Sequence, residues 1–335
     1  MPRRRGGCHK SGETEGARKT KGPLVAIVGP TAVGKSELAL RLAEEFGGEI
    51  VSADSRQIYR GLDIGTAKPT AEERRRVPHH LLDVVDPDEV LTLAQYQELA
   101  YAAIDDILAR GKVPFLVGGT GLYIKAVVEG WSIPRVPPNE KLRAEMYRLA
   151  ECEGPEALHA RLREVDPVAA ARIDPRNVRR VVRALEVYAE TGRPISELQR
   201  RSPPPYRTLQ IGLTMEREEL YRRIDARVER MIERGLVEEV RGLIERGYGL
   251  DLPAMSGLGY REIGLYLKGE IGLEEAIRLI KRNTRRFVRH QYNWFRLNDP
   301  DIHWFDALSE PYDEIKKLVV SFLGAACEFY SQAKS

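Results

Sequence analysis

The chain has 335 residues, 42% of them hydrophobic, and a formal net charge of +3. It can therefore bury a core, while the overall charge alone does not indicate a nucleic-acid partner. Its apolar runs are too short to span a membrane, and its start lacks the apolar segment of a secretory signal. The cysteines, Cys8, Cys152 and Cys327, lack the spacing of a metal site or a disulfide framework. We expect a cytoplasmic protein, with residues 1–22 as a disordered basic tail.

The first part of the chain alternates between predicted strands and helices. Three short apolar runs predict buried strands, at residues 24–28, 49–53 and 113–117. A capping box formed by Thr92 and Gln95 opens one helix, which closes near Gly111. Strands and helices in this alternation are typical of a doubly wound parallel sheet, so residues 23–135 are predicted to be an α/β core.

A helical region follows the core. Pro137 and Pro138 mark the boundary, and residues 136–205 are predicted to form an all-helical insertion domain. One of its helices has Asp174 as the expected N-cap and Gly192 as the expected stop. The helix has one apolar face, and the opposite face carries Arg176, Arg179, Arg180 and Arg183.

Residues 206–325 are predicted to return to the core, through a strand at 209–214 and then through helices, with 326–335 as a flexible tail. Between Glu275 and Asp299 the sequence has no acidic residue. At helical spacing one face carries Arg278, Arg282, Arg285 and Arg289, and the buried face carries Ile277, Ile280, Phe287, Val288 and Tyr292. A basic stretch without counter-charge favours a polyanionic partner over a merely solvated face.

A phosphate-binding loop lies between the first predicted strand and the helix after it. It consists of Gly29, Pro30, Thr31, Ala32, Val33, Gly34, Lys35 and Ser36, in the pattern G-x-x-x-x-G-K-[ST]. Successive N–H groups and the helix N-terminus bind the anion, Lys35 adds a charge, and the Ser36 hydroxyl can ligate Mg²⁺. The chain lacks the guanine-reading N-K-x-D of GTPases. Its best later apolar strand is followed by Gly118, Gly119 and Thr120 instead of the acidic residues of a motor or AAA-type ATPase, which favours a transferase.

Together with this loop, several further strings resemble the tRNA dimethylallyltransferase (isopentenyltransferase) family, of the bacterial type because no C-terminal zinc finger is present. They are D-S-R-Q-I-Y at 54–59, G-L-D-I-G-T-A-K-P at 61–69, P-H-H-L-L-D at 78–83, V-G-G-T-G-L-Y at 117–123, R-A-L-E at 183–186 and G-Y-R-E at 259–262. The resemblance covers roughly residues 23–308. It implies transfer of a dimethylallyl group from its diphosphate to the N6 amine of the adenosine at position 37 of tRNA, by a P-loop enzyme that is expected to be a monomer.

The resemblance also implies roles for single residues. Asp54 follows a strand beside the phosphate loop and is the expected general base, with a Mg²⁺-organising or helix-capping carboxylate as the alternative. Thr120 is expected to contact the substrate nucleotide, or else to serve as a turn hydroxyl. Arg227, and Arg223 on the same helical face, are expected to bind the diphosphate; the alternative for Arg223 is a solvated face paired with Glu219 and Asp225.

The tRNA anticodon stem-loop is the expected partner. Residues 255–260 are predicted to be a loop against the RNA, or alternatively a plain helix connection. The residues expected to contact tRNA are Asp54, Ser55, Arg56, Gln57, Thr120, Arg143, Arg179, Arg180, Arg183, Met255, Ser256, Gly257, Leu258, Gly259, Tyr260, Arg282, Arg285 and Arg289. The adenine must leave its stack to reach Asp54, so base flipping is expected.

Three other functions fit parts of the sequence. An isopentenyltransferase for free adenine nucleotides would share the loop and Asp54 but need little basic surface. A small-molecule or nucleotide kinase would use the same loop for ATP. A non-catalytic RNA-binding module would have no reason to combine Lys35, Ser36 and Asp54.

Overall fold

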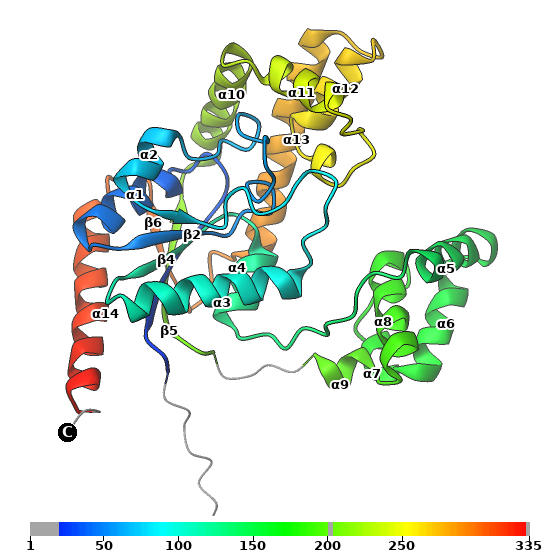
Figure 1. The fold of residues 1–335 in the computed structure, drawn as a ribbon, viewed down its shortest axis with the longest axis horizontal. Coiled ribbons are helices and arrows are strands. Elements are labelled where there is room, and N and C mark those ends of the chain that lie inside the picture. The colour runs from blue at the N-terminus through cyan, green and yellow to red at the C-terminus, as the bar shows by residue number, and fades with distance from the viewer. Residues whose placement is uncertain (1–19, 200–203, 333–335) are drawn as a thin grey trace, which may run out of the picture.

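The computed structural model describes residues 20–199 and 204–332. Within them, six parallel strands form one sheet in the order β3-β2-β4-β1-β5-β6 (Figure 1). The strands are β1 Pro23–Val28, β2 Glu49–Ser52, β3 His79–His80, β4 Pro114–Val117, β5 Arg207–Thr214 and β6 Ile302–Asp306. The predicted doubly wound α/β fold is confirmed. Most of the tail predicted at 1–22 lies outside the described residues.

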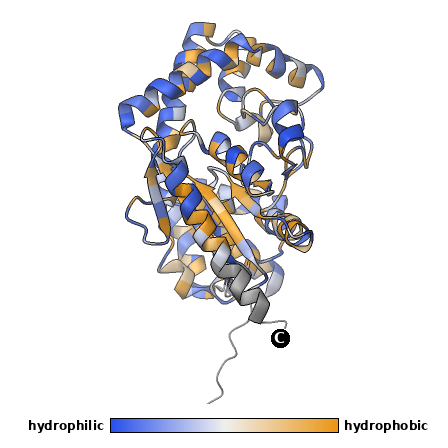
Figure 2. Ribbon diagram, turned by 90° about the vertical axis from the view of Figure 1, so that its left-hand side faces the viewer, coloured by the Kyte–Doolittle hydropathy of each residue, from blue (hydrophilic) through white to orange (hydrophobic). Residues whose placement is uncertain are grey.

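The sheet separates two hydrophobic cores because successive side chains of a strand point to opposite faces. In β1, Leu24, Ala26 and Val28 pack in the core shared with α3 (Leu93–Ala109). Val25 and Ile27 pack in the other core, with α1 (Lys35–Glu45) and α14 (Tyr312–Gln332). The central strands are covered on both faces, and Figure 2 shows them in the orange of hydrophobic residues.

A second group of helices covers the carboxyl ends of the strands (Figure 1). It consists of α10 Arg217–Glu233, α11 Leu236–Glu245, the 3₁₀ turn η1 Ala254–Ser256, α12 Tyr260–Leu267 and α13 Leu273–Trp294. Two shorter helices, α2 Ala71–Arg76 and α4 Gly121–Val128, belong to the sheet layers. Of the loop predicted at 255–260, only residues 257–259 connect η1 to α12, because Met255 and Ser256 belong to the 3₁₀ turn and Tyr260 begins α12.

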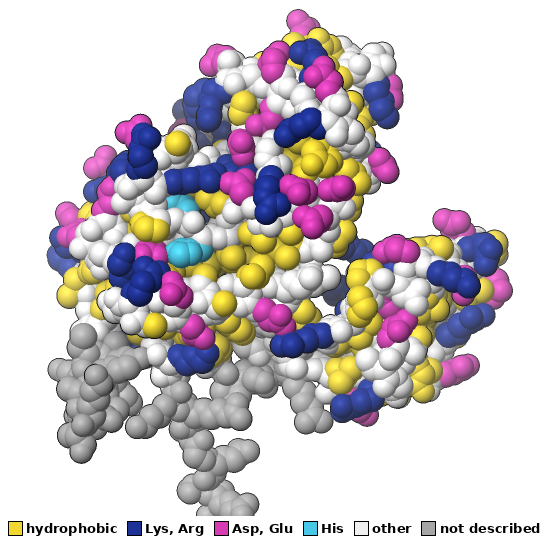
Figure 3. Space-filling model, in the orientation of Figure 1, with side chains coloured by type: hydrophobic (Ala, Val, Ile, Leu, Met, Phe, Trp, Pro, Cys, Tyr) yellow, Lys and Arg dark blue, Asp and Glu magenta, His cyan; other side chains and the backbone are white. Residues whose placement is uncertain are grey.

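The helical insertion forms a separate lobe beside the sheet (Figures 1 and 3). Its helices are α5 Glu140–Glu153, α6 Pro155–Val165, α7 Pro167–Ala170, α8 Val178–Thr191 and α9 Ile195–Leu198. They enclose a hydrophobic core of their own, which includes Leu158, Leu162, Val181 and Val187. Gly192 ends α8 in the left-handed conformation, as predicted.

The predicted start of α8 is wrong. Asn177 is the N-cap, with its side chain accepting a hydrogen bond from the Arg180 N–H. Asp174 instead accepts from the N–H of Arg176, which closes a turn before the helix. Asp and Asn can both cap a helix, and here Asn177 does so because it directly precedes Val178, the first residue of the helix.

Glu186 joins the insertion lobe to the segment that leads into it. This fully buried carboxylate accepts hydrogen bonds from Arg143 (2.8 Å), Arg183 (2.6 Å) and the Asn139 N–H (2.8 Å). Arg183 also donates to the Val136 carbonyl (3.1 Å). Burial opposes ionisation of Glu186, but the hydrogen bonds from Arg143, Asn139 and Arg183 outweigh it and hold the pKa of this carboxyl below its usual range.

One prediction for the C-terminal region is wrong: the chain is not helical throughout, because Ile302–Asp306 forms β6 beside β5 at the sheet edge. The helix α14 extends to Gln332 and so includes part of the segment predicted at 326–335, whose last three residues lie outside the described residues. In the part of the chain that the structure describes, no helix combines the length and apolar character needed to cross a bilayer.

Candidate active site

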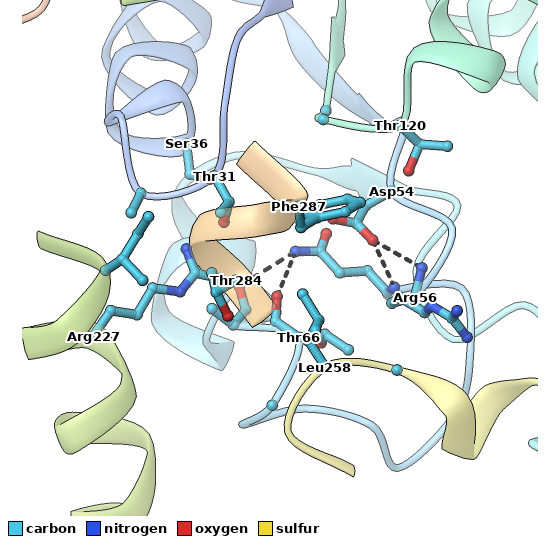
Figure 4. A pocket seen from close by; sticks show the side chains of 18 of the residues that line it. Thr31, Ser36, Asp54, Arg56, Thr66, Thr120, Arg227, Leu258, Thr284 and Phe287 are labelled. Carbon is cyan, nitrogen blue, oxygen red and sulfur yellow. Dashed lines mark hydrogen bonds between the residues drawn. The ribbon is translucent and has the colours of Figure 1, made fainter. Parts of the chain in front are cut away.

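A cavity of about 1000 Å³ lies at the carboxyl ends of β1, β2 and β4. Parallel α/β sheets place their sites at this edge because loops that follow neighbouring strands converge there. The cavity is bounded by the phosphate loop, by the segment after β2 and by the turn after β4, and residues of α10, α12 and α13 close it from the other side (Figure 4).

The phosphate loop connects β1 directly to α1, as predicted. Ala32 and Gly34 both have positive φ angles, of 66° and 106°, and Gly34 is the N-cap of α1. Such alternation turns successive N–H groups toward one point, which makes an anion-binding concavity at a helix N-terminus. Ser36 lies in the first turn of α1 and lines the cavity, while the Lys35 ammonium donates to the Pro30 carbonyl (2.7 Å).

Three arginines of α10 line the cavity opposite the phosphate loop: Arg223, Arg227 and Arg230. Burial lowers the pKa of the Lys35 ammonium to about 7, with the Arg227 guanidinium acting in the same direction and Asp54 against it. Burial also lowers the pKa of Arg227, which Asp54 opposes and Arg230 reinforces. Clustered cations in a half-buried site favour an anion of more than one charge.

Arg227 and Arg223 differ in their partners. Arg223 donates a hydrogen bond to Glu219 (3.1 Å), so it is ion-paired with this residue, as the alternative interpretation expected. The other expected partner, Asp225, pairs with Arg285 instead. Among the described residues, the Arg227 guanidinium has neither an ion pair nor a hydrogen bond. Its guanidinium is therefore available to a bound anion.

Asp54 follows β2 and lines the cavity, as expected for a residue at a strand end. Its Oδ1 accepts hydrogen bonds from the N–H groups of Arg56 (2.8 Å) and Gln57 (3.4 Å), so this oxygen caps the turn. Within the described residues Oδ2 receives no hydrogen bond. The geometry therefore combines a turn-capping oxygen with a second oxygen free to accept a proton from a substrate.

Thr120 lies at the start of α4, after the β4 strand. Its Oγ1 accepts a hydrogen bond from the Ser55 N–H (3.0 Å) and donates one to the Ser55 hydroxyl (3.3 Å). Thr120 therefore stabilises the turn after β2, which is the role that the alternative interpretation gave it. The same contact fixes Thr120 beside the segment that carries Asp54 (Figure 4). The residue can position the loop and still face the cavity.

The segment after Asp54 is held to the loop before α12. Arg56 donates to the Pro253 carbonyl (2.5 Å) and to the Ser256 hydroxyl (3.3 Å). Gln57 donates to the Thr66 carbonyl (3.3 Å). Of the predicted loop, Ser256, Gly257, Leu258 and Tyr260 line the cavity, whereas Met255 is buried in the core.

Sequence reasoning missed several residues that line this cavity: Thr66, Arg230, Thr284, Arg286, Phe287, His290 and Gln291. Phe287 was predicted to be buried, but its side chain is 41% exposed and faces the cavity. A large apolar residue on an amphipathic helix resembles a core residue in sequence, and only the position of the helix shows otherwise. Gln291 carried a signal, since it is a polar residue on the apolar register of α13.

The basic stretch of α13 has more counter-charge than its sequence suggests. Arg278 pairs with Glu275 (2.6 Å) on its own helix. Lys281 pairs with Glu229 of α10 (2.6 Å), and Arg285 with Asp225. Among the described residues Arg282, Arg286 and Arg289 form no ion pair, and all three are exposed. Fewer basic side chains of α13 are therefore available to a polyanion than the sequence predicted.

The remaining predicted RNA contacts lie away from the cavity. Arg143 and Arg183 are bound to Glu186 in the insertion lobe, while Arg179 and Arg180 are exposed on α8. The exposed arginines of α8 and α13 thus present two separate basic surfaces, on two lobes.

Comparison with known proteins identifies relatives across most of the chain. A model of the family described as IPP transferase matches residues 57–298. A tRNA dimethylallyltransferase of Roseiflexus sp. (strain RS-1) is 61% identical over 274 residues, which are 82% of this chain and 90% of that protein. A tRNA dimethylallyltransferase of Thermomicrobium roseum is 56% identical over 299 residues, 89% of this chain and 90% of that protein.

Two solved structures are also similar to this chain. The full-length tRNA isopentenylpyrophosphate transferase of Bacillus halodurans is 44% identical, with a TM-score of 0.69, covering 92% of this chain and 99% of that chain. A eukaryotic dimethylallyltransferase acting on tRNA is 30% identical, with a TM-score of 0.74, covering 89% of this chain and 77% of that chain.

Proposed function

Because the chain belongs to the IPP transferase family, we infer that it is a transferase that attaches a dimethylallyl group to tRNA. We propose that the donor is dimethylallyl diphosphate and that the acceptor is the N6 amine of adenosine 37, next to the anticodon. One observation carries this proposal: the phosphate loop, the Asp54 carboxylate and Arg227 face one cavity, and in the described ranges neither Asp54 Oδ2 nor the Arg227 guanidinium has a hydrogen-bond partner.

The reaction needs charge stabilisation at the leaving diphosphate and a base at the acceptor amine. The bond from the allylic carbon to the diphosphate oxygen breaks, and its electron pair leaves with the diphosphate. The N6 nitrogen forms the new bond to that carbon and loses a proton, which Asp54 accepts at Oδ2. The loop N–H groups, Lys35 and Arg227 stabilise the charge that grows on the leaving oxygens.

The donor set of the site fits Mg²⁺, which prefers oxygen ligands and retains water and phosphate oxygens. The Ser36 hydroxyl and the Asp54 carboxylate lie on the same cavity. No group of three or more Asp, Glu, His or Cys residues in the described ranges could enclose a metal by itself. We propose that Ser36 holds the ion together with the diphosphate, where it would neutralise charge on the leaving group.

The tRNA contacts are proposed to come from both lobes. Exposed Arg179 and Arg180 on α8 can bind backbone phosphates of the anticodon stem-loop, as can Arg282, Arg286 and Arg289 on α13. The target base is proposed to leave its stack and enter the cavity, where Phe287 offers an aromatic face.

An assay with two acceptors and a control without acceptor tests this function against the alternatives. The protein is incubated with dimethylallyl diphosphate, Mg²⁺ and either unmodified tRNA, free AMP or no acceptor, and the digested RNA and the free nucleotides are examined by mass spectrometry. A parallel incubation contains ATP and no prenyl donor. We expect prenylated adenosine from tRNA alone. Product from AMP but not from tRNA would establish the free-nucleotide enzyme, and turnover of ATP without a prenyl donor would establish a kinase.

Diphosphate binding should be coupled to proton uptake by Lys35. In the free site its pKa is about 7, and a bound anion raises it. Below this pH Lys35 is already charged, whereas above it binding must supply the proton, so its contribution to affinity falls as pH rises. Calorimetry of inorganic diphosphate at pH 8, in buffers of different ionisation enthalpy, should show uptake of about one proton relative to Lys35→Arg. Equal proton uptake by the two proteins would contradict this assignment.

A further inference from the structure

Gln291 lies on α13 and bridges two loops of the active site. Its Oε1 accepts a hydrogen bond from the Thr31 N–H of the phosphate loop (2.9 Å), and its Nε2 donates to the Gly119 carbonyl of the turn after β4 (3.0 Å). The side chain is only 4% exposed. We propose that Gln291 is a positioning residue, which holds the phosphate loop in the shape that binds the diphosphate of the donor. This inference rests on the proposed function for the identity of the donor.

The first of these bonds decides which N–H groups the anion can use. The Thr31 N–H donates its hydrogen bond to Gln291 and is therefore not available to an anion. The concavity for the diphosphate must therefore be built by the N–H groups that follow, from Ala32 onward, where the positive φ angles occur. Without Gln291 the Thr31 N–H would be left unsatisfied, and the loop could turn this donor inward and change the cradle.

Only a primary amide of this length satisfies both loops. One end must accept from an N–H and the other must donate to a carbonyl. A glutamate would place a carboxylate against the Gly119 carbonyl, and a methionine would fill the space but offer neither a comparable donor nor a comparable acceptor. This explains a buried polar residue on a helix face whose other buried positions include Ile280 and Val288.

The packing around Gly119 is shaped to receive this side chain. A Cβ atom at Gly119 would lie 2.3 Å from Gln291 Nε2, while its next neighbour outside that side chain would be the Gly29 carbonyl oxygen at 3.7 Å. An alanine at 119 therefore collides with Gln291 and with little else. The two positions form a matched pair, because removing the Gln291 side chain removes the obstacle to a side chain at 119.

The neighbouring residues of α13 fasten the helix to the sheet layers in other ways. Trp294 packs against Gly121 of α4, where a Cβ would lie 2.3 Å from it. The Tyr292 hydroxyl is hydrogen-bonded to Thr214 Oγ1 (2.9 Å) at the end of β5. Since the Tyr292 hydroxyl is hydrogen-bonded to β5 and not to the phosphate loop, it provides a control for general anchoring of the helix.

A double-mutant cycle tests the proposal. The variants are Gln291→Ala, Gly119→Ala and the two combined, each measured for kcat and KM with dimethylallyl diphosphate, for tRNA affinity and for thermal unfolding. We expect each single change to lower kcat/KM for the donor by about 10- to 100-fold, since small displacements of binding groups have effects of this size. The combined variant should resemble Gln291→Ala alone, and tRNA affinity should be little changed.

Two further variants separate positioning from stability. Gln291→Met keeps the packing volume but removes both hydrogen bonds, so its donor kcat/KM should fall, and its Tm should fall less than that of Gln291→Ala. Tyr292→Phe should lower Tm but leave the KM for the donor unchanged. The proposal is overturned if Gln291→Met retains full donor kcat/KM, or if the losses from Gln291→Ala and Gly119→Ala multiply in the combined variant.

Binding of inorganic diphosphate, followed by calorimetry, makes the test independent of turnover. If the unaltered protein forms no prenylated tRNA, the proposed function fails. Weaker diphosphate binding by Gln291→Met would still support the positioning role, and unchanged binding would reject it.

Discussion

Replacing Asp54 with asparagine should lower the rate of prenyl transfer by about 10²-fold or more while tRNA affinity stays nearly unchanged. Asparagine keeps an oxygen that can accept from the Arg56 N–H, so the turn after β2 should persist. It removes the carboxylate oxygen proposed to take the proton from the adenine amine. Single-turnover kinetics measure this loss directly, because product release does not limit them.

Asp54→Ala separates the two roles of this side chain. Alanine removes the base and also the acceptor for the Arg56 and Gln57 N–H groups. We expect its transfer rate to fall at least as far as that of Asp54→Asn, and its Tm to fall further. Rapid transfer by the asparagine variant would exclude Asp54 as the base, and an equal loss of tRNA binding would assign it to RNA recognition instead.

Arg227→Ala should reduce kcat/KM for the prenyl donor by about 10²- to 10³-fold, the usual effect of removing one donor that stabilises developing negative charge. Its guanidinium lies opposite the phosphate loop and is free of partners among the described side chains. Steady-state kinetics with saturating tRNA measure the effect. Arg227→Lys should recover part of it, because a lysine restores the charge without the planar pair of donors.

Arg223→Ala provides the matched control, since Arg223 lies one turn away on α10 and lines the same cavity. It is already hydrogen-bonded to Glu219. We expect a much smaller loss of donor kcat/KM than for Arg227→Ala. Equal losses would mean that the diphosphate displaces Glu219 and binds both arginines, which contradicts the assignment of Arg227 alone.

Much of this fold was readable from the sequence because its signals are local. The buried strands β1, β2 and β4 are short apolar runs, and the phosphate loop is one contiguous motif between a strand and a helix. The edge strands escaped notice for the opposite reason. β6 contains His303 and Trp304 and is partly exposed, and β3 has only two residues, so neither shows an apolar run.

The site was readable only where single positions carried the chemistry. Lys35, Asp54, Thr120 and Arg227 were predicted and share one cavity. Pairing between distant residues left no trace in the sequence. The counter-charge for Arg285 comes from α10, and Gln291 meets a loop far away in the chain, at Thr31. Such contacts depend on the angles and positions at which helices pack, and these cannot be read from the order of residues along the chain.

The separate hydrophobic core of the insertion lobe has an evolutionary consequence. Since α5 to α9 complete their own packing, a substitution there can alter stability or surface charge in that lobe without disturbing the sheet. If the exposed Arg179 and Arg180 bind tRNA as proposed, selection can change RNA binding through this lobe while the residues that line the active-site cavity stay the same.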